Sequence, residues 1–122
     1  MEKKNWYAIF TVARAEKRVK RSLEQEGIEN YLPVREIDFK RNGQERRLEI
    51  PIVSGCIFVR ISEMNVGSLL SIPGVVTFVQ KEQKPMTIPD EQMENLQRLK
   101  ERCEYASCES QFEKWLRGMI NN

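Results

Sequence analysis

The first part of the chain is patterned as an apolar strand followed by a helix. Residues 6–12 read WYAIFTV, and this run of aromatic and β-branched side chains predicts a buried strand. A helix is expected over residues 14–26, because Val19 and Leu23 recur at i, i+4 and Gly27 is a residue type that often follows a helix end. The chain therefore opens with a strand that leads directly into a helix.

An extended region with a tight turn comes next. Residues 28–40 are expected to be extended, and Pro33 indicates a sheet edge or a bulge. Asn42 and Gly43 predict a hairpin turn, because both residue types tolerate positive φ. Residues 48–52 are then the return strand of a hairpin.

The second half of the chain alternates short strands with helices. The dense apolar run at residues 56–61 predicts a central strand, and residues 75–79 predict a further one. Between them a short helix is expected over residues 66–71, with Asn65 as its cap. Asp90 can cap a longer helix, whose apolar stripe consists of Met93, Leu96, Leu99 and Cys103.

The order of these elements predicts the fold class. It reads β-α-β-β-β-α-β-α and is followed by a C-terminal amphipathic helix. Such an order in 122 residues predicts the α+β class, with an antiparallel-dominated sheet of four to five strands and helices packed on it. The length allows one domain with a substantial core.

Positive charge is concentrated in the first half of the chain. The net charge is +2, but residues 1–60 hold 13 Lys and Arg against 9 Asp and Glu, a net charge of +4. Five of these cations cluster within eight residues. Four of them are the candidates for contact with nucleic acid, namely Arg14, Lys17, Arg18 and Arg21, and the fifth is Lys20. Contacts between such cations and phosphates give weak, salt-sensitive binding that does not depend on the base sequence. A solvated helix face is the alternative interpretation.

The composition argues against catalysis. The chain has no histidine, so it lacks the usual general base and the partner of Ser-His or Cys-His nucleophiles. Cys56, Cys103 and Cys108 are an odd number without a Cys-x-x-Cys pair, which predicts free thiols and a reducing cytoplasmic location. Neither a metal nor another cofactor is expected. Cys56 is expected to serve as a small hydrophobic residue in its strand.

Several segments resemble the amino-terminal (NGN) domain of NusG-type proteins. They are WY at residues 6–7, EKRV at 16–19, GIENYLP at 27–33, SGCIFV at 54–59, PGVVTFV at 73–79, KP at 84–85 and IPDE at 88–91. The resemblance predicts a NusG-like domain over residues 5–104 and a C-terminal extension over residues 105–122. GIENYLP and PDEQM look most like the UpxY branch, the antiterminators of capsular polysaccharide operons. No Gly-rich sequence of a KOW domain is seen in this chain, and whether one was removed or is naturally absent stays open.

The resemblance implies a role in transcription. In this family the domain binds the clamp helices of the β′ subunit of bacterial RNA polymerase, bridges toward the β subunit, and suppresses pausing or termination. Basic residues near the bridge can touch the non-template DNA strand of the transcription bubble. The resemblance therefore implies an elongation and antitermination factor without enzymatic activity.

The resemblance also implies an apolar patch that binds the polymerase. Its candidate residues are Ala8, Phe10, Val53, Cys56, Phe58 and Phe78. Val53 and Cys56 stand where the family has an aromatic pair, so the pocket is expected to be shallower here. For any one of these residues, an ordinary core position is the simpler interpretation. A contiguous exposed apolar patch would instead favour a binding site.

The last segment of the chain is unusually apolar for a tail. SQFE at residues 110–113 resembles a capping box and predicts a helix over residues 110–120. Its stripe consists of Phe112, Trp115, Leu116, Met119 and Ile120. Such a stripe is expected to dock on an apolar surface. A neutral site elsewhere on the sheet ranks first, pairing with a second copy in a homodimer ranks second, and masking of the patch near Val53 and Cys56 ranks third.

Two other classes of function stay open at this point. A general single-stranded nucleic-acid-binding module would present a basic sheet face with exposed aromatic side chains. A thiol-dependent enzyme would hold Cys56 in a deep pocket beside a cation or a helix N-terminus.

Overall fold

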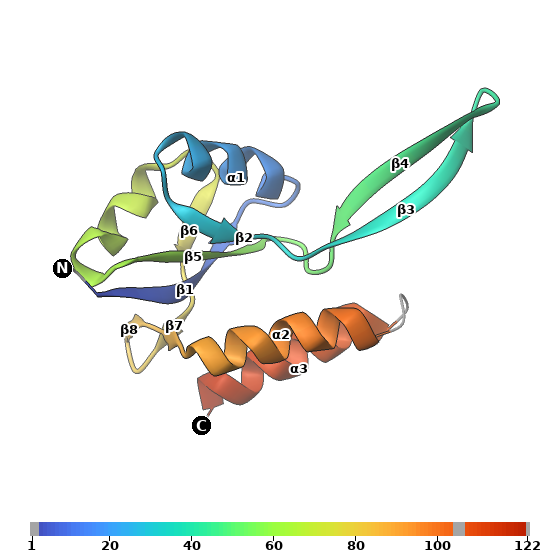
Figure 1. The fold of residues 1–122 in the computed structure, drawn as a ribbon. Helices are drawn as coiled ribbons and strands as arrows, with labels where there is room; N and C mark the ends of the chain where they lie inside the picture. Colours follow the sequence, from blue (N-terminus) through green and yellow to red (C-terminus); the bar gives the residue numbers. More distant parts are fainter. Residues whose placement is uncertain (1–2, 104–106, 122) are drawn as a thin grey trace.

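The computed structural model of the chain describes residues 3–103 and 107–121, and it has the predicted α+β architecture (Figure 1). The elements in order are β1 (Lys4–Thr11), α1 (Glu16–Gln25), β2 (Glu29–Tyr31), β3 (Val34–Arg41), β4 (Gln44–Pro51), β5 (Cys56–Ser62), the 3₁₀-helix η1 (Glu63–Ser71), β6 (Val75–Phe78), β7 (Gln80–Lys81), β8 (Lys84–Pro85), β9 (Thr87–Ile88), α2 (Asp90–Arg102) and α3 (Cys108–Asn121). Among these residues, no helix combines the length and the apolar character that a membrane crossing requires.

A five-stranded antiparallel sheet forms the centre of the fold. Its strand order is β2-β5-β1-β6, and β9 pairs with another part of β1. The prediction that residues 56–61 form a central strand is confirmed, because β5 lies between β2 and β1. The dense apolar sequence of β5 fits this place, since the strand is covered on both faces.

Helices cover the two faces of the sheet with separate apolar clusters. On one face, Val19 and Leu23 of α1 pack with Ile9 and Ile57 of the sheet and with Leu69 of η1. On the other face, α2 and α3 lie against the sheet (Figure 1), and their apolar side chains belong to one cluster with residues of β1 and β5. The apolar side of α1 therefore packs on one face of the sheet, and the apolar sides of α2 and α3 pack on the opposite face.

The β3–β4 hairpin projects away from this body (Figure 1). Eight residue pairs join its strands, from Val34 with Pro51 to Arg41 with Gln44. The predicted turn is confirmed, because Asn42 and Gly43 both have positive φ, 53° and 77°.

Some element boundaries differ from the prediction. The first helix begins at Glu16, because Arg14 has a φ of 68° and belongs to the preceding loop. The short helix is a 3₁₀-helix that begins at Glu63, and Asn65 lies inside it with its amide donating to the Ser62 hydroxyl. The last helix begins at Cys108 and is preceded by Ser107, whose hydroxyl accepts a hydrogen bond from Gln111.

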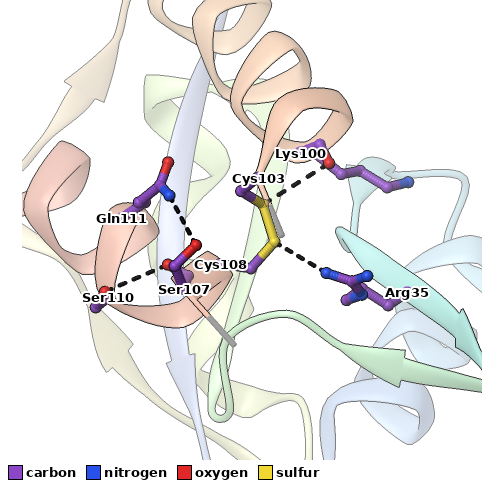
Figure 2. The surroundings of a disulfide bond; sticks show 7 residues. All are labelled: Arg35, Lys100, Cys103, Ser107, Cys108, Ser110 and Gln111. Carbon is purple, nitrogen blue, oxygen red and sulfur yellow. Dashed lines mark hydrogen bonds between the residues drawn. A yellow bond between two sulfur atoms is a disulfide. The ribbon is translucent and has the colours of Figure 1, made fainter. Parts of the chain in front are cut away.

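The prediction of three free thiols is wrong for two of them. Cys103 follows the end of α2, Cys108 opens α3, and a disulfide bond joins the two (Figure 2). Because α3 returns alongside α2, the Cα atoms of Cys103 and Cys108 lie 5.2 Å apart, a separation that a disulfide spans readily. A guanidinium nitrogen of Arg35 donates to Cys108 Sγ at 3.3 Å (Figure 2). The cysteine count alone therefore does not support a reducing compartment.

Candidate functional site

Five of the six patch candidates lie on the sheet face that α2 and α3 cover. In the β1–β5 register Ala8 is opposite Phe58 and Phe10 is opposite Cys56, so alternation places all four side chains on the same face. Val53, in the turn before β5, packs against the same cluster. The structure thus brings these residues together from three parts of the chain.

Phe78 is not part of this group. It pairs with Ile9, and both side chains belong to the cluster under α1 on the opposite face. Its inclusion in the patch is therefore a wrong prediction. The reason is the register of β6 on β1, which aligns Phe78 with an α1-facing residue.

The accessible part of the patch lies at the end of β1. Ala8, Cys56 and Phe58 are buried, whereas Phe10 is 39% exposed. Val12, just beyond β1, and Val76 of the neighbouring β6 are also exposed. Their sequence carries no signal of exposure, because valine in a strand is most often a core residue. Phe10 is thus the patch candidate that a partner can reach without any rearrangement of the fold.

Helix α3 lies on the buried part of the same face. The Phe112 and Trp115 rings stand 5.8 and 5.9 Å from the Phe58 ring, measured between ring centroids, both in edge-to-face geometry. Phe112 is 1% exposed. The predicted order of docking sites is therefore wrong, because the stripe packs on the patch that ranked third. The small Cys56 side chain lies in the same cluster as the two rings.

A disulfide bond and two hydrogen bonds hold α3 in this position along its length. Near its start, Cys108 is bonded to Cys103. In its middle, the Trp115 indole N–H donates to Gln92 of α2 at 3.2 Å. At its end, the Lys81 ammonium donates to the Met119 carbonyl at 2.9 Å, which places a cation at the negative end of the helix dipole.

Cys56 is unsuited to nucleophilic chemistry. Its side chain is buried in the apolar cluster, and this desolvation raises the pKa of the thiol to about 12. The reactive thiolate is therefore scarce at neutral pH. This disfavours a thiol-dependent enzyme.

Three of the four cationic candidates lie on the outer side of α1, and the fourth, Arg14, lies in the loop just before it. The side chains of Arg14, Lys17, Arg18 and Arg21 are exposed. Within residues 3–103 and 107–121, none of these four has a carboxylate partner within 4 Å. Lys20 differs, since its ammonium is 3.1 Å from Glu24 and donates to Asn30. The four candidates thus form a cationic face that is available to an anionic partner.

An internal hydrogen bond fixes the start of this helix against the patch turn. Glu16 is 4% exposed, and its carboxylate accepts a hydrogen bond from the Gly55 N–H at 3.0 Å. Gly55 has a φ of 78°, and a side chain there would meet the Thr11 carbonyl oxygen at 3.1 Å. The cationic face and the turn containing Val53 are therefore held in a fixed relation.

Comparisons with known proteins agree with this architecture. Residues 4–97 match the sequence model of the NusG family, described as transcription termination factor nusG. Among solved structures, the chain is similar to the one described as "Domain interaction in Thermotoga maritima NusG", with a TM-score of 0.53 and 22% identity. That match covers 75% of this chain and 54% of the other, so this chain spans about half the length of its structural relative. A search of the curated proteins finds no match.

Proposed function

Because the chain belongs to the NusG family of transcription termination factors, we propose that it is an elongation and antitermination factor that binds RNA polymerase. Its main contact is with the β′ clamp helices of the polymerase. From there it bridges the active-site cleft of the polymerase toward the β subunit. The family match over residues 4–97 carries this proposal. In its most specific form, the proposal places the chain in the UpxY branch, with capsular polysaccharide operons as its targets. The activity is non-enzymatic and cytoplasmic.

The apolar face around Phe10 is the proposed contact with the clamp helices. Phe10 is exposed at the end of β1, and alternation along β1 and β5 places it on the same face as Phe58, which lies under α3. Partner sites commonly take this form of a contiguous apolar patch with a central aromatic anchor. For Phe58 to contact a partner, α3 must leave the face, because its Phe112 and Trp115 rings pack on the Phe58 ring.

Replacing Phe10 with alanine is expected to weaken clamp-helix binding about 30-fold, because truncation of an interface anchor typically costs about 2 kcal/mol. Phe10 is 39% exposed, so the variant should fold. The measurement is a titration with an isolated clamp-helix fragment, after a urea melt has shown that the variant is folded. Met64→Ala is the matched control, because Met64 is 76% exposed on η1. A folded Phe10→Ala protein that binds as tightly as the control would place the contact elsewhere.

The cationic face of α1 is the proposed contact with the non-template DNA strand. Changing Arg14, Arg18 and Arg21 to glutamate should weaken this contact most at low salt and leave clamp-helix binding nearly intact. Crosslinking to the bubble strand in a stalled elongation complex measures the contact. The control changes three other exposed cations, Lys84→Glu, Lys114→Glu and Arg117→Glu. Equal crosslinking in wild type and both variants would leave α1 as a solvated face.

A further inference from the structure

The β3–β4 hairpin has two chemically different faces. Paired residues in an antiparallel ladder share a face, and the faces alternate along the strands. One face carries the pairs Glu36 with Glu49, Asp38 with Arg47, and Lys40 with Glu45. The other carries the pairs Ile37 with Leu48, Phe39 with Arg46, and Arg41 with Gln44.

The first face carries four acids and two cations, so its net charge is negative. The Arg47 guanidinium donates to Asp38 at 3.2 Å and lies 3.2 Å from a Glu36 carboxylate oxygen. The hydrogen bond to Asp38 and the nearby Glu36 charge raise the pKa of Arg47. This face is therefore unsuited to an anionic partner.

The second face has exposed apolar groups and unpaired cations. Phe39 is 39% exposed and Leu48 is 44% exposed. Arg46 donates to the Gln44 side-chain carbonyl, and within the described parts of the chain neither Arg41 nor Arg46 has a carboxylate within 4 Å. Overall, residues 39–47 hold four cations and one acid. The tip is thus positive, with an exposed aromatic ring among its cations.

A shallow hollow near the tip brings these groups together. It has a volume of about 450 Å³, and its lining residues are Phe39, Arg41, Asn42, Gln44 and Arg46. No acidic residue lines it. The lining therefore offers one aromatic ring, two guanidinium groups and two side-chain amides.

We propose that this second face binds single-stranded nucleic acid. A base stacks on the Phe39 ring, Arg41 and Arg46 neutralise the flanking phosphates, and the amides of Asn42 and Gln44 hydrogen-bond the base edge. Aromatic side chains beside cations are the usual platform for unpaired bases, and the absence of acids in the hollow suits a polyanion. The site is separate from the cationic face of α1, and it does not depend on polymerase binding.

The test is fluorescence anisotropy of the whole chain with a labelled oligothymidylate of about 15 nucleotides, near the upper site size of single-strand-binding folds. Phe39→Leu should weaken binding about tenfold because it removes the stacking ring, whereas Phe39→Tyr should retain the wild-type affinity. Arg41→Gln with Arg46→Gln should also lower the log–log salt slope by about 1.4, since each single-strand phosphate contact contributes roughly 0.7. Lys40→Gln removes an equal charge beside Arg41 on the opposite face and should have a smaller effect than Arg41→Gln.

Three results would overturn the proposal. The first is wild-type affinity in Phe39→Leu. The second is an equal loss in Lys40→Gln and Arg41→Gln, which would indicate net charge without a site. The third is complete loss of oligothymidylate binding in the Arg14, Arg18 and Arg21 variant, with no effect of the hairpin substitutions. None of these results bears on clamp-helix binding, so failure here is distinguishable from failure of the proposed function.

Discussion

Deleting residues 106–122 is expected to raise the affinity for the β′ clamp helices about 100-fold. The deletion removes α3, whose Phe112 and Trp115 rings cover Phe58. Burial of side chains of this size contributes roughly 1.5–3 kcal/mol each. A net docking free energy of about 3 kcal/mol leaves roughly 1% of molecules open and lowers the apparent affinity by that factor.

The same clamp-helix titration, together with sedimentation and a urea melt, separates the possible roles of α3. Tighter binding in the deleted chain supports masking. Loss of a concentration-dependent dimer would instead indicate that α3 pairs two copies. Lower stability with unchanged affinity would mean that α3 only packs, and this outcome contradicts the masking prediction. Glu113→Ala with Arg117→Ala is the matched control, because both side chains are exposed on the docked helix.

Phe58→Ala is expected to lower the free energy of unfolding by about 3–5 kcal/mol, the usual cost of removing a buried aromatic side chain. Phe58 is fully buried, and its ring contacts those of Tyr31, Phe112 and Trp115 at centroid distances of 6.4, 5.8 and 5.9 Å. Denaturant unfolding measures this loss. Phe58 is therefore a poor site for testing polymerase binding by alanine substitution, in contrast to Phe10.

The control for this prediction is the same substitution at an exposed phenylalanine. Phe39→Ala on the hairpin should cost less than about 1 kcal/mol, because Phe39 packs against no core. Phe58→Leu should cost less than about 1.5 kcal/mol, since it keeps most of the buried volume. Similar losses at Phe58 and Phe39 would show that α2 and α3 do not close over the sheet.

Local chemistry was enough to predict most of the fold. The aromatic and β-branched run of β1, the Asn42-Gly43 turn and the dense apolar run of β5 each predict their structure within a few residues. The first residue of α1 could not be predicted in the same way. The positive φ of Arg14 excludes it from the helix, but the spacing of apolar residues does not reveal that φ. Strands β7, β8 and β9 have two residues each, too few for a periodic pattern.

The composition of the candidate site could not be predicted fully from the sequence pattern, because it depends on how the strands pair. Alternation tells which residues of one strand share a face, but the register between strands decides which faces coincide. The family resemblance grouped Ala8, Phe58 and Phe78, and the strand registers place Ala8 opposite Phe58 but Phe78 opposite Ile9, on the other face. The Cys103–Cys108 bond likewise follows from the return of α3 along α2, which the spacing of the two cysteines did not reveal.

We propose that the clamp helices bind the face around Phe10 and displace α3. Hydrogen exchange of the whole chain, alone and with a saturating clamp-helix fragment, tests it most directly. We predict increased amide protection at the end of β1 and in β6, with faster exchange throughout α3 as it leaves the sheet. Saturable binding that leaves α3 exchange unchanged, with new protection only at α1 or the hairpin, would contradict the claim.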